Sequence, residues 1–261
     1  EMFKLLELKS ILKKFDNIDK EISLDYDIIS DFSEAELYVN SMCKEKLVGI
    51  SLTLVEGEIL AIGLSCKNIT RVIISGGFLT TDYLCSYIDK LVSSDAILSM
   101  MDVKQYLPYM SICEEKHNVF DIGLAAYLLN PMKDSYTYDD ISRDYLNILL
   151  PSKKELLGKS EITSMTVGME VNVKIYAYEA YVSSMAYEVL INALDEKDMK
   201  SLYYDIELPT MYTLYDMQIR GIKVDRVKLK EYGDQLVDRI SELEQNIHHM
   251  AGEEFNINSP K

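Results

Sequence analysis

The spacing of apolar and polar residues divides the chain into a strand-rich part, an alternating part and a helical part. Short turn-forming links join three strand-like runs, LVGISLTL (47–54), EILAIGLSC (58–66) and TRVIISGG (70–77), so antiparallel hairpins are predicted. Helices are then predicted to alternate with two further strands, AILSMM (96–101) and HNVFDI (117–122). Asp121 is well placed to cap the helix GLAAYLLN that follows. The pattern predicts an α/β fold, a mixed five-stranded sheet with helices on its faces.

The rest of the chain carries a helical pattern. Residues 171–198 predict one long helix whose apolar face consists of Ile175, Tyr178, Val182, Met185, Val189 and Ala193. Beyond residue 200 we expect a helix over 201–219, a break at Gly221, and a long charged helix from Asp225 that Gly252 ends. Residues 1–15 predict a short amphipathic helix, with an acidic connector after it. The predicted parts are therefore 1–30, 31–200 and 201–261.

Charge and cysteine usage narrow the possible functions. With 27 basic and 43 acidic residues, the chain has a formal net charge of −16. Nucleic-acid affinity comes largely from cations that neutralise phosphates, so any nucleic-acid role would need a local basic patch. The four cysteines, Cys43, Cys66, Cys85 and Cys113, are scattered, as reduced packing thiols of a cytosolic protein would be. The sequence contains only three histidines and no apolar run of membrane-spanning length, so we expect neither a histidine metal site nor a membrane span.

The C-terminal stretch from residue 206 to residue 261 carries a specific resemblance. Its ELP turn (207–209), its RGIKVD step (220–225) and its end, AGEEFNINSPK (251–261), resemble family A DNA polymerases of the bacterial DNA polymerase I group. The stretch is similar to the junction between the exonuclease-like and polymerase domains. The opening FKLLELKSILKKF resembles the link from the 5′-nuclease domain. The resemblance implies an RNase H-like 3′–5′ exonuclease fold over 31–200, and over 201–261 the first, incomplete helices of the polymerase domain, leading into its thumb.

The resemblance also implies where catalytic residues would stand. In active relatives two metal ions are held by an Asp-x-Glu on the first strand, an Asp after the fourth strand and a Tyr-xxx-Asp on a late helix. These positions correspond here to Ser51 and Thr53, to Tyr106, and to Tyr176 and Ala180. All four carboxylate positions are neutral, so we expect no catalytic residue, metal or cofactor in this chain. The resemblance implies Mg²⁺ for the parent polymerase alone.

Three hypotheses about the function of the chain are consistent with the sequence. The first is a degenerate exonuclease-like domain that serves as a structural scaffold. The second is an active exonuclease whose metal ligands are rearranged onto Asp102, Glu179 and Glu56. The third is a module that binds a DNA strand without cutting it.

The resemblance implies DNA as a partner through the parent polymerase, and the polymerase and 5′-nuclease domains as intramolecular partners. It implies a bacterial, cytoplasmic and nucleoid-associated protein. Candidate DNA-contacting residues are Asn258, Ser259 and Lys261. The basic residues from Lys223 to Lys230 are instead interpreted as a solvated helix face, with Lys230 paired to Asp234.

Overall fold

The computed structural model describes residues 24–110 and 118–258. The helix predicted over 1–15 lies outside these residues, as do Cys113, Ser259 and Lys261. Within them the strands form one mixed six-stranded sheet with the order β1-β4-β3-β2-β5-β6. The strands are β1 (Tyr26–Ile29), β2 (Leu47–Val55), β3 (Glu58–Cys66), β4 (Ile69–Ile74), β5 (Ile97–Met100) and β6 (Val119–Asp121).

The sheet combines the predicted hairpins with parallel strands. β3 pairs antiparallel with both β2 and β4, whereas β5 lies parallel to β2 and β6 lies parallel to β5. The prediction of five strands was one short, because β1 pairs parallel to β4 at the edge of the sheet. β1 is only four residues long and its two central residues are exposed, so its sequence lacks the alternation that identifies a half-buried strand.

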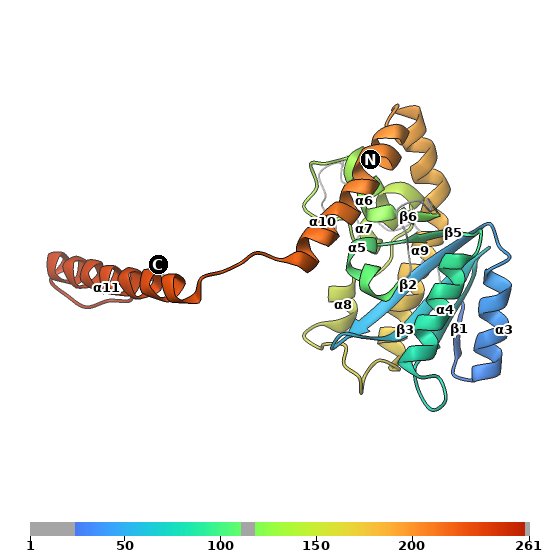
Figure 1. Ribbon diagram of the computed structural model, residues 1–261, viewed down its shortest axis with the longest axis horizontal. Helices are drawn as coiled ribbons and strands as arrows, with labels where there is room; N and C mark the ends of the chain where they lie inside the picture. The colour runs from blue at the N-terminus through green and yellow to red at the C-terminus, as the bar shows by residue number, and fades with distance from the viewer. Residues whose placement is uncertain (1–23, 111–117, 259–261) are drawn as a thin grey trace, which may run out of the picture. The chain divides into compact units, whose positions relative to one another are not determined.

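Helices cover the sheet (Figure 1). Some lie between its strands in the sequence, and the others come after the last strand. α4 packs on β3, α3 packs on α4, and α9 contacts β2, β3, β4 and β5. The helical elements are α3 (Phe32–Met42), α4 (Thr81–Ser93), α5 (Val103–Tyr106), η1 (Leu107–Tyr109), α6 (Ile122–Leu129), α7 (Tyr138–Leu146), α8 (Lys153–Leu157), α9 (Glu170–Glu196), η2 (Leu202–Glu207), α10 (Leu208–Arg220) and α11 (Arg226–Ala251). This mixed sheet with helices confirms the predicted fold class.

Two glycines allow α9 to lie directly on the central strands. A Cβ atom at Gly49 would come within 2.2 Å of the Ala180 carbonyl oxygen, and one at Gly63 within 2.8 Å of the Tyr176 carbonyl oxygen. Both distances are shorter than van der Waals contact, so only glycine permits this approach of helix to sheet. The face of β2 that carries Gly49 therefore also carries Ser51 and Thr53 toward α9.

The buried face of α9 differs from the predicted one in its second half. Ile175, Tyr178 and Val182 are buried as predicted, but Val189 is 40% exposed. Ala186, Leu190 and Leu194 are buried instead. From Ile175 to Val189 the predicted positions alternate steps of three and four residues, a spacing that drifts around a straight helix over several turns.

The helices beyond residue 200 begin and end close to the predicted residues. Asp225 caps α11 by accepting hydrogen bonds from the Val227 and Lys228 backbone N–H groups. Gly252 ends the helix in the left-handed conformation with φ 74°, as predicted. The predicted helix over 201–219 is two elements, since the π-helix η2 immediately precedes α10 and its Pro209, which has no N–H to continue the ladder.

By its internal contacts the chain separates into two compact units, Glu1–Tyr215 and Asp216–Lys261. The first unit extends past residue 200 because Tyr203, Leu208 and Met211 are buried. No α11 residue is buried. The predicted domain limits at 30 and 200 stay a prediction. No helix within 24–110 and 118–258 has both the length and the apolar character required to cross a bilayer.

Candidate functional site

A cleft of about 1010 Å³ lies where β2 meets α5, α8 and α9. It brings together four of the five predicted positions: Ser51, Thr53, Tyr106 and Tyr176. Ala180 is the exception, because it is fully buried and does not line the cleft. The fold therefore gathers residues that are up to 125 positions apart in the sequence, as between Ser51 and Tyr176.

Two hydroxyl groups that line the cleft, those of Ser51 and Tyr106, are engaged with the backbone. The Ser51 hydroxyl donates to the Tyr176 carbonyl oxygen at 2.7 Å and thereby joins β2 to α9. The Tyr106 hydroxyl donates to the Leu52 carbonyl oxygen, also at 2.7 Å. Each bond uses the single proton of its hydroxyl, so both side chains have a structural role here.

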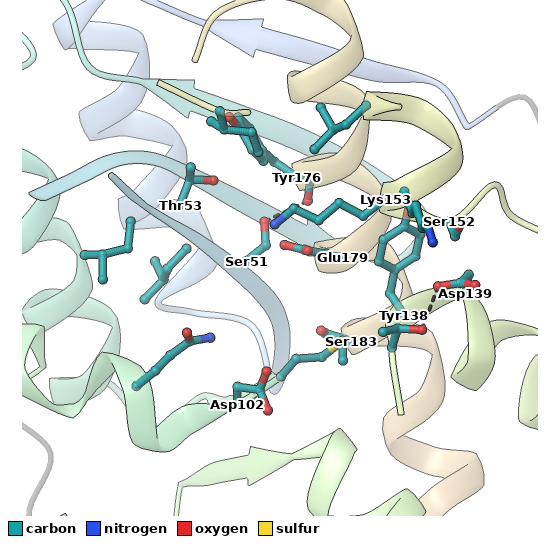
Figure 2. A pocket seen from close by; sticks show the side chains of 18 of the residues that line it. Ser51, Thr53, Asp102, Tyr138, Asp139, Ser152, Lys153, Tyr176, Glu179 and Ser183 are labelled. Atoms are coloured by element: carbon teal, nitrogen blue, oxygen red, sulfur yellow. Dashed lines mark hydrogen bonds between the residues drawn. The ribbon is translucent and has the colours of Figure 1, made fainter. Parts of the chain in front are cut away.

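Burial keeps the cleft tyrosines neutral. Burial raises the pKa of Tyr106 and of Tyr176, and Glu179 raises both further. The side chain of Thr53 lies beside Tyr176 in Figure 2. It lowers the pKa of Tyr176 and so acts against the rise that burial causes. A neutral phenol is a poor ligand for a hard divalent cation, which prefers anionic oxygen.

Ala180 stands at the interface between helix and sheet. Its methyl group lies 3.2 Å from the position that a Cβ atom of Gly63 would take, and its carbonyl oxygen lies over Gly49. A carboxylate at this position would be placed between α9 and the sheet and would lose its hydration without a compensating partner.

Five carboxylates line the cleft, those of Asp102, Asp139, Asp140, Glu161 and Glu179. Asp102 and Glu179 line it, and Asp102 has a left-handed backbone with φ 49° just before α5. Burial raises the pKa of Glu179 to about 7; Lys153 acts against this shift and Asp102 adds to it. Figure 2 shows Lys153 extending across the cleft with its ammonium group toward Ser51 and Glu179.

Glu56, the third acidic residue of the hypothetical rearranged site, lies outside the cleft. It is exposed, forms the turn between β2 and β3 with φ 53°, and does not line the cleft. No group of three or more histidine, cysteine, aspartate or glutamate side chains in the described part of the chain could hold a metal ion. The five acidic residues that line the cleft form no such group, so among the described residues they do not fit a pair of divalent cations.

The α8 side of the cleft was not predicted from the sequence. α8 begins with a capping box in which Glu155 N–H donates to the Ser152 hydroxyl and the Ser152 N–H donates to the Glu155 carboxylate. The Tyr138 hydroxyl donates to the Pro151 carbonyl oxygen at 2.6 Å and ties the same segment to α7. The S-x-x-E spacing of Ser152 and Glu155 is the signal that predicts this helix start.

Of the proposed DNA-contacting residues, only Asn258 is described. It lies in a turn, and its backbone N–H donates to the Asn256 side chain at 3.0 Å. Lys230 pairs with Asp234 at 2.7 Å, as predicted, and both side chains are exposed.

Comparison with solved structures defines the class of fold. The chain matches the POL domain of Pol1 from M. smegmatis with a TM-score of 0.64, over 90% of this chain and 39% of that one, at 19% identity. It matches the catalytic core of RRP6 from Trypanosoma brucei with a TM-score of 0.56, over 74% of this chain and 54% of that one, at 11% identity. At such low identity these likenesses show the fold alone, the RNase H-like fold of exonuclease domains.

Comparison with curated proteins finds relatives of one kind, although no protein-family model matches the chain. DNA polymerase I of Caldicellulosiruptor bescii is 28% identical over 267 positions, which cover the whole of this chain and 28% of the relative. DNA polymerase I of Bacillus subtilis is 34% identical over 151 positions, 57% of this chain and 17% of the relative. The chain is thus similar to a part of bacterial DNA polymerase I, and it spans less than a third of the length of these relatives.

Proposed function

We propose that this part of a DNA polymerase I is an exonuclease-like domain without nuclease activity that serves as a structural scaffold. The observation that carries the proposal is the state of the four carboxylate positions. Ser51 and Tyr106 are bonded to backbone carbonyls, Thr53 lies beside Tyr176, and Ala180 is packed against the sheet. None supplies the negative charge that two-metal hydrolysis requires.

In this proposal the protein acts on DNA through parts of the polymerase other than this domain. The parent enzyme is a DNA-directed DNA polymerase of the bacterial cytoplasm, associated with the nucleoid, and uses Mg²⁺. Residues 31–200 form the exonuclease-like domain, residues 1–30 connect it to a 5′-nuclease domain, and residues 201–261 lead into the polymerase domain. The domain then holds its two neighbours apart and supports the polymerase domain.

A nuclease assay tests the proposal. The purified chain is incubated with 5′-labelled single-stranded DNA and either Mg²⁺ or Mn²⁺, and we expect no shortening of the strand over hours. Asp102→Asn and Glu179→Gln are the matched controls, because they neutralise two carboxylates that line the same cleft as the predicted metal positions. Degradation that co-purifies with the chain and is abolished by either substitution would establish the rearranged active site instead.

A measurement of DNA-binding affinity on the same samples distinguishes the scaffold hypothesis from the hypothesis of a module that binds a DNA strand. A net charge of −16 opposes the phosphate field, so binding should be no tighter than the non-specific range of about 10⁻⁴–10⁻⁶ M at physiological salt. A submicromolar complex with single-stranded DNA at that salt would favour the module.

A further inference from the structure

The long helix α11 presents an apolar stripe on its surface. The stripe consists of five side chains, each between 44% and 61% exposed: Leu229, Tyr232, Leu236, Ile240 and Leu243. No α11 residue is buried, although a helix gains most of its stability from packing such a face. The stripe therefore has the composition of a contact surface, and its spacing and the charges beside it indicate what fits it.

The spacing of the stripe is symmetric about its centre. From either end the steps are three, four, four and three residues, with Leu236 in the middle. An antiparallel second copy of the helix would therefore place Leu236 at a two-fold axis. Tyr232 would meet Ile240 on either side of this axis, and Leu229 would meet Leu243 at the two ends. The stripe is thus complementary to itself when one copy is reversed.

The charged residues beside the stripe differ between its two ends. Arg226 and Lys228 form its basic end, and Glu242 and Glu244 form its acidic end. Arg226 and Glu244 are a whole number of helical turns apart, so they flank the stripe on the same side. Lys228 and Glu242 flank it on the other side. In an antiparallel pair each basic residue would therefore face the acidic residue of its own side, within about 3 Å along the helix axis.

We propose that α11 pairs with α11 of a second copy of this chain, antiparallel and through the apolar stripe. A parallel pair would bring Arg226 and Lys228 against the same two residues of the other copy and would align the two helix dipoles, which is unfavourable. Glu242 pairs with Arg239 in its own helix, but both side chains stay exposed and accessible to a further charge. The inference does not depend on the proposed function, because none of these residues lines the cleft.

Charge reversal tests both the surface and the orientation. Sedimentation of the whole chain over a range of concentrations should show an equilibrium between monomer and dimer. Reversing the basic end (Arg226→Glu with Lys228→Glu) should raise the dissociation constant of the dimer at least about tenfold, because like charges then meet at both ends of the pair. Reversing the acidic end (Glu242→Lys with Glu244→Lys) should do the same. Both reversals in one chain should restore the dimer, a result that only the antiparallel pairing predicts.

A matched control separates this effect from that of net charge. Glu231→Lys with Asp238→Lys changes the net charge as much as reversal of the acidic end does, but on the face of α11 opposite the stripe. This control should not weaken the dimer. The reversals place acids near the start of α11 and bases near its end, where the helix dipole favours them, so the helix should persist. Circular dichroism checks that it does.

Three outcomes would overturn the proposal. The first is a chain that stays monomeric at millimolar concentration. The second is one dissociation constant shared by all the charge variants, because association would then use another surface. The third is weakening by each single reversal without recovery in the combined variant, which would exclude the antiparallel orientation. The nuclease assay involves none of these residues, so failure of this inference is distinguishable from failure of the proposed function.

Discussion

At the scale of single residues, the site is defined by how closely α9 approaches the sheet. Gly63 lies opposite Ser51 in the β2–β3 pairing, and the Ser51 hydroxyl reaches past it to the Tyr176 carbonyl oxygen. The same approach buries Ala180. The Ser51 hydroxyl and the Ala180 methyl group are therefore parts of a packed interface.

Substituting Gly63 with alanine should be strongly destabilising. The added Cβ atom would lie 2.4 Å from the Ser51 Oγ atom and 2.8 Å from the Tyr176 carbonyl oxygen, so α9 would have to move. We expect a loss of about 1–3 kcal/mol in the free energy of unfolding, as for other overpacked sites, measured by urea denaturation. Gly76→Ala is the matched control, because a Cβ atom there meets no atom within 4 Å. Equal, small effects of the two substitutions would contradict the described packing.

A second residue with a measurable electrostatic signature is Asp121. It is buried at the end of β6, and its carboxylate accepts hydrogen bonds from the Val103 N–H at 2.9 Å and the Leu124 N–H at 3.0 Å. Burial nevertheless raises its pKa to about 6, against the lowering effect of these bonds. Asp102 contributes a smaller rise in the same direction.

The raised pKa of Asp121 predicts a pH dependence of stability. The folded chain binds this proton more tightly than the unfolded chain, so the contribution of Asp121 is greatest at low pH and is lost as pH rises from about 4 to about 6. Asp121→Asn should flatten the stability profile over that interval, whereas Asp121→Ala should also lose the cap, at a cost of about 1–2 kcal/mol. Urea titrations at pH 4.5, 5.5 and 7 measure both. An unchanged slope in Asp121→Asn would contradict the assignment.

At the scale of elements, strong local signals allowed prediction and weak ones did not. β3 was predicted over its full observed length, and the caps Asp121 and Gly252 were predicted correctly, because each depends on residues adjacent in sequence. β1 and α8 were missed. β1 depends on pairing with β4, and α8, at five residues, is too short to show helical periodicity.

In the candidate site, too, some residues were predicted from the sequence and others were not. Ser51, Thr53, Tyr106 and Tyr176, which the resemblance singled out, line one cleft, although nothing in their local sequence indicates that they meet. Lys153 carried no comparable signal, since a lysine in a polar segment is usually solvated. Its place in the cleft depends on α7, α8 and α9 packing together, and such contacts between elements cannot be read from spacing alone.

The helical segment after residue 200 is joined to the sheet by aromatic packing. Tyr203 of η2 is fully buried and contacts the ring of Phe120 with 4.9 Å between centroids. Its hydroxyl accepts from the Asp121 N–H at 2.7 Å. This packing explains why the first compact unit extends to Tyr215, beyond the point where the strand periodicity of the sequence ends.

At the scale of the whole molecule, the second compact unit differs from the first because the apolar side chains of its long helix α11 are exposed. α11 has apolar residues at three- and four-residue spacing, yet Leu229, Tyr232, Leu236, Ile240 and Leu243 are each between 44% and 61% exposed. This apolar stripe, defined by those five residues, is what a buried helix face requires. Most helical stability in proteins comes from packing such a face, and within the second compact unit these five side chains stay partly exposed.

The exposed stripe predicts a difference in local stability along the chain. At low protein concentration, amide exchange over residues 226–258 should be faster by orders of magnitude than exchange in β2 and β3, because opening of α11 disrupts no buried contacts. At high concentration the stripe can be covered by self-association, and exchange over α11 should then slow while the sheet stays unchanged. Leu236→Glu, at the centre of the stripe, should abolish that concentration dependence, and Lys230→Glu, a residue of the same helix outside the stripe, should not. Slow exchange over α11 in a chain that sedimentation shows to be monomeric would contradict the prediction, since the stripe would then be packed within the chain itself.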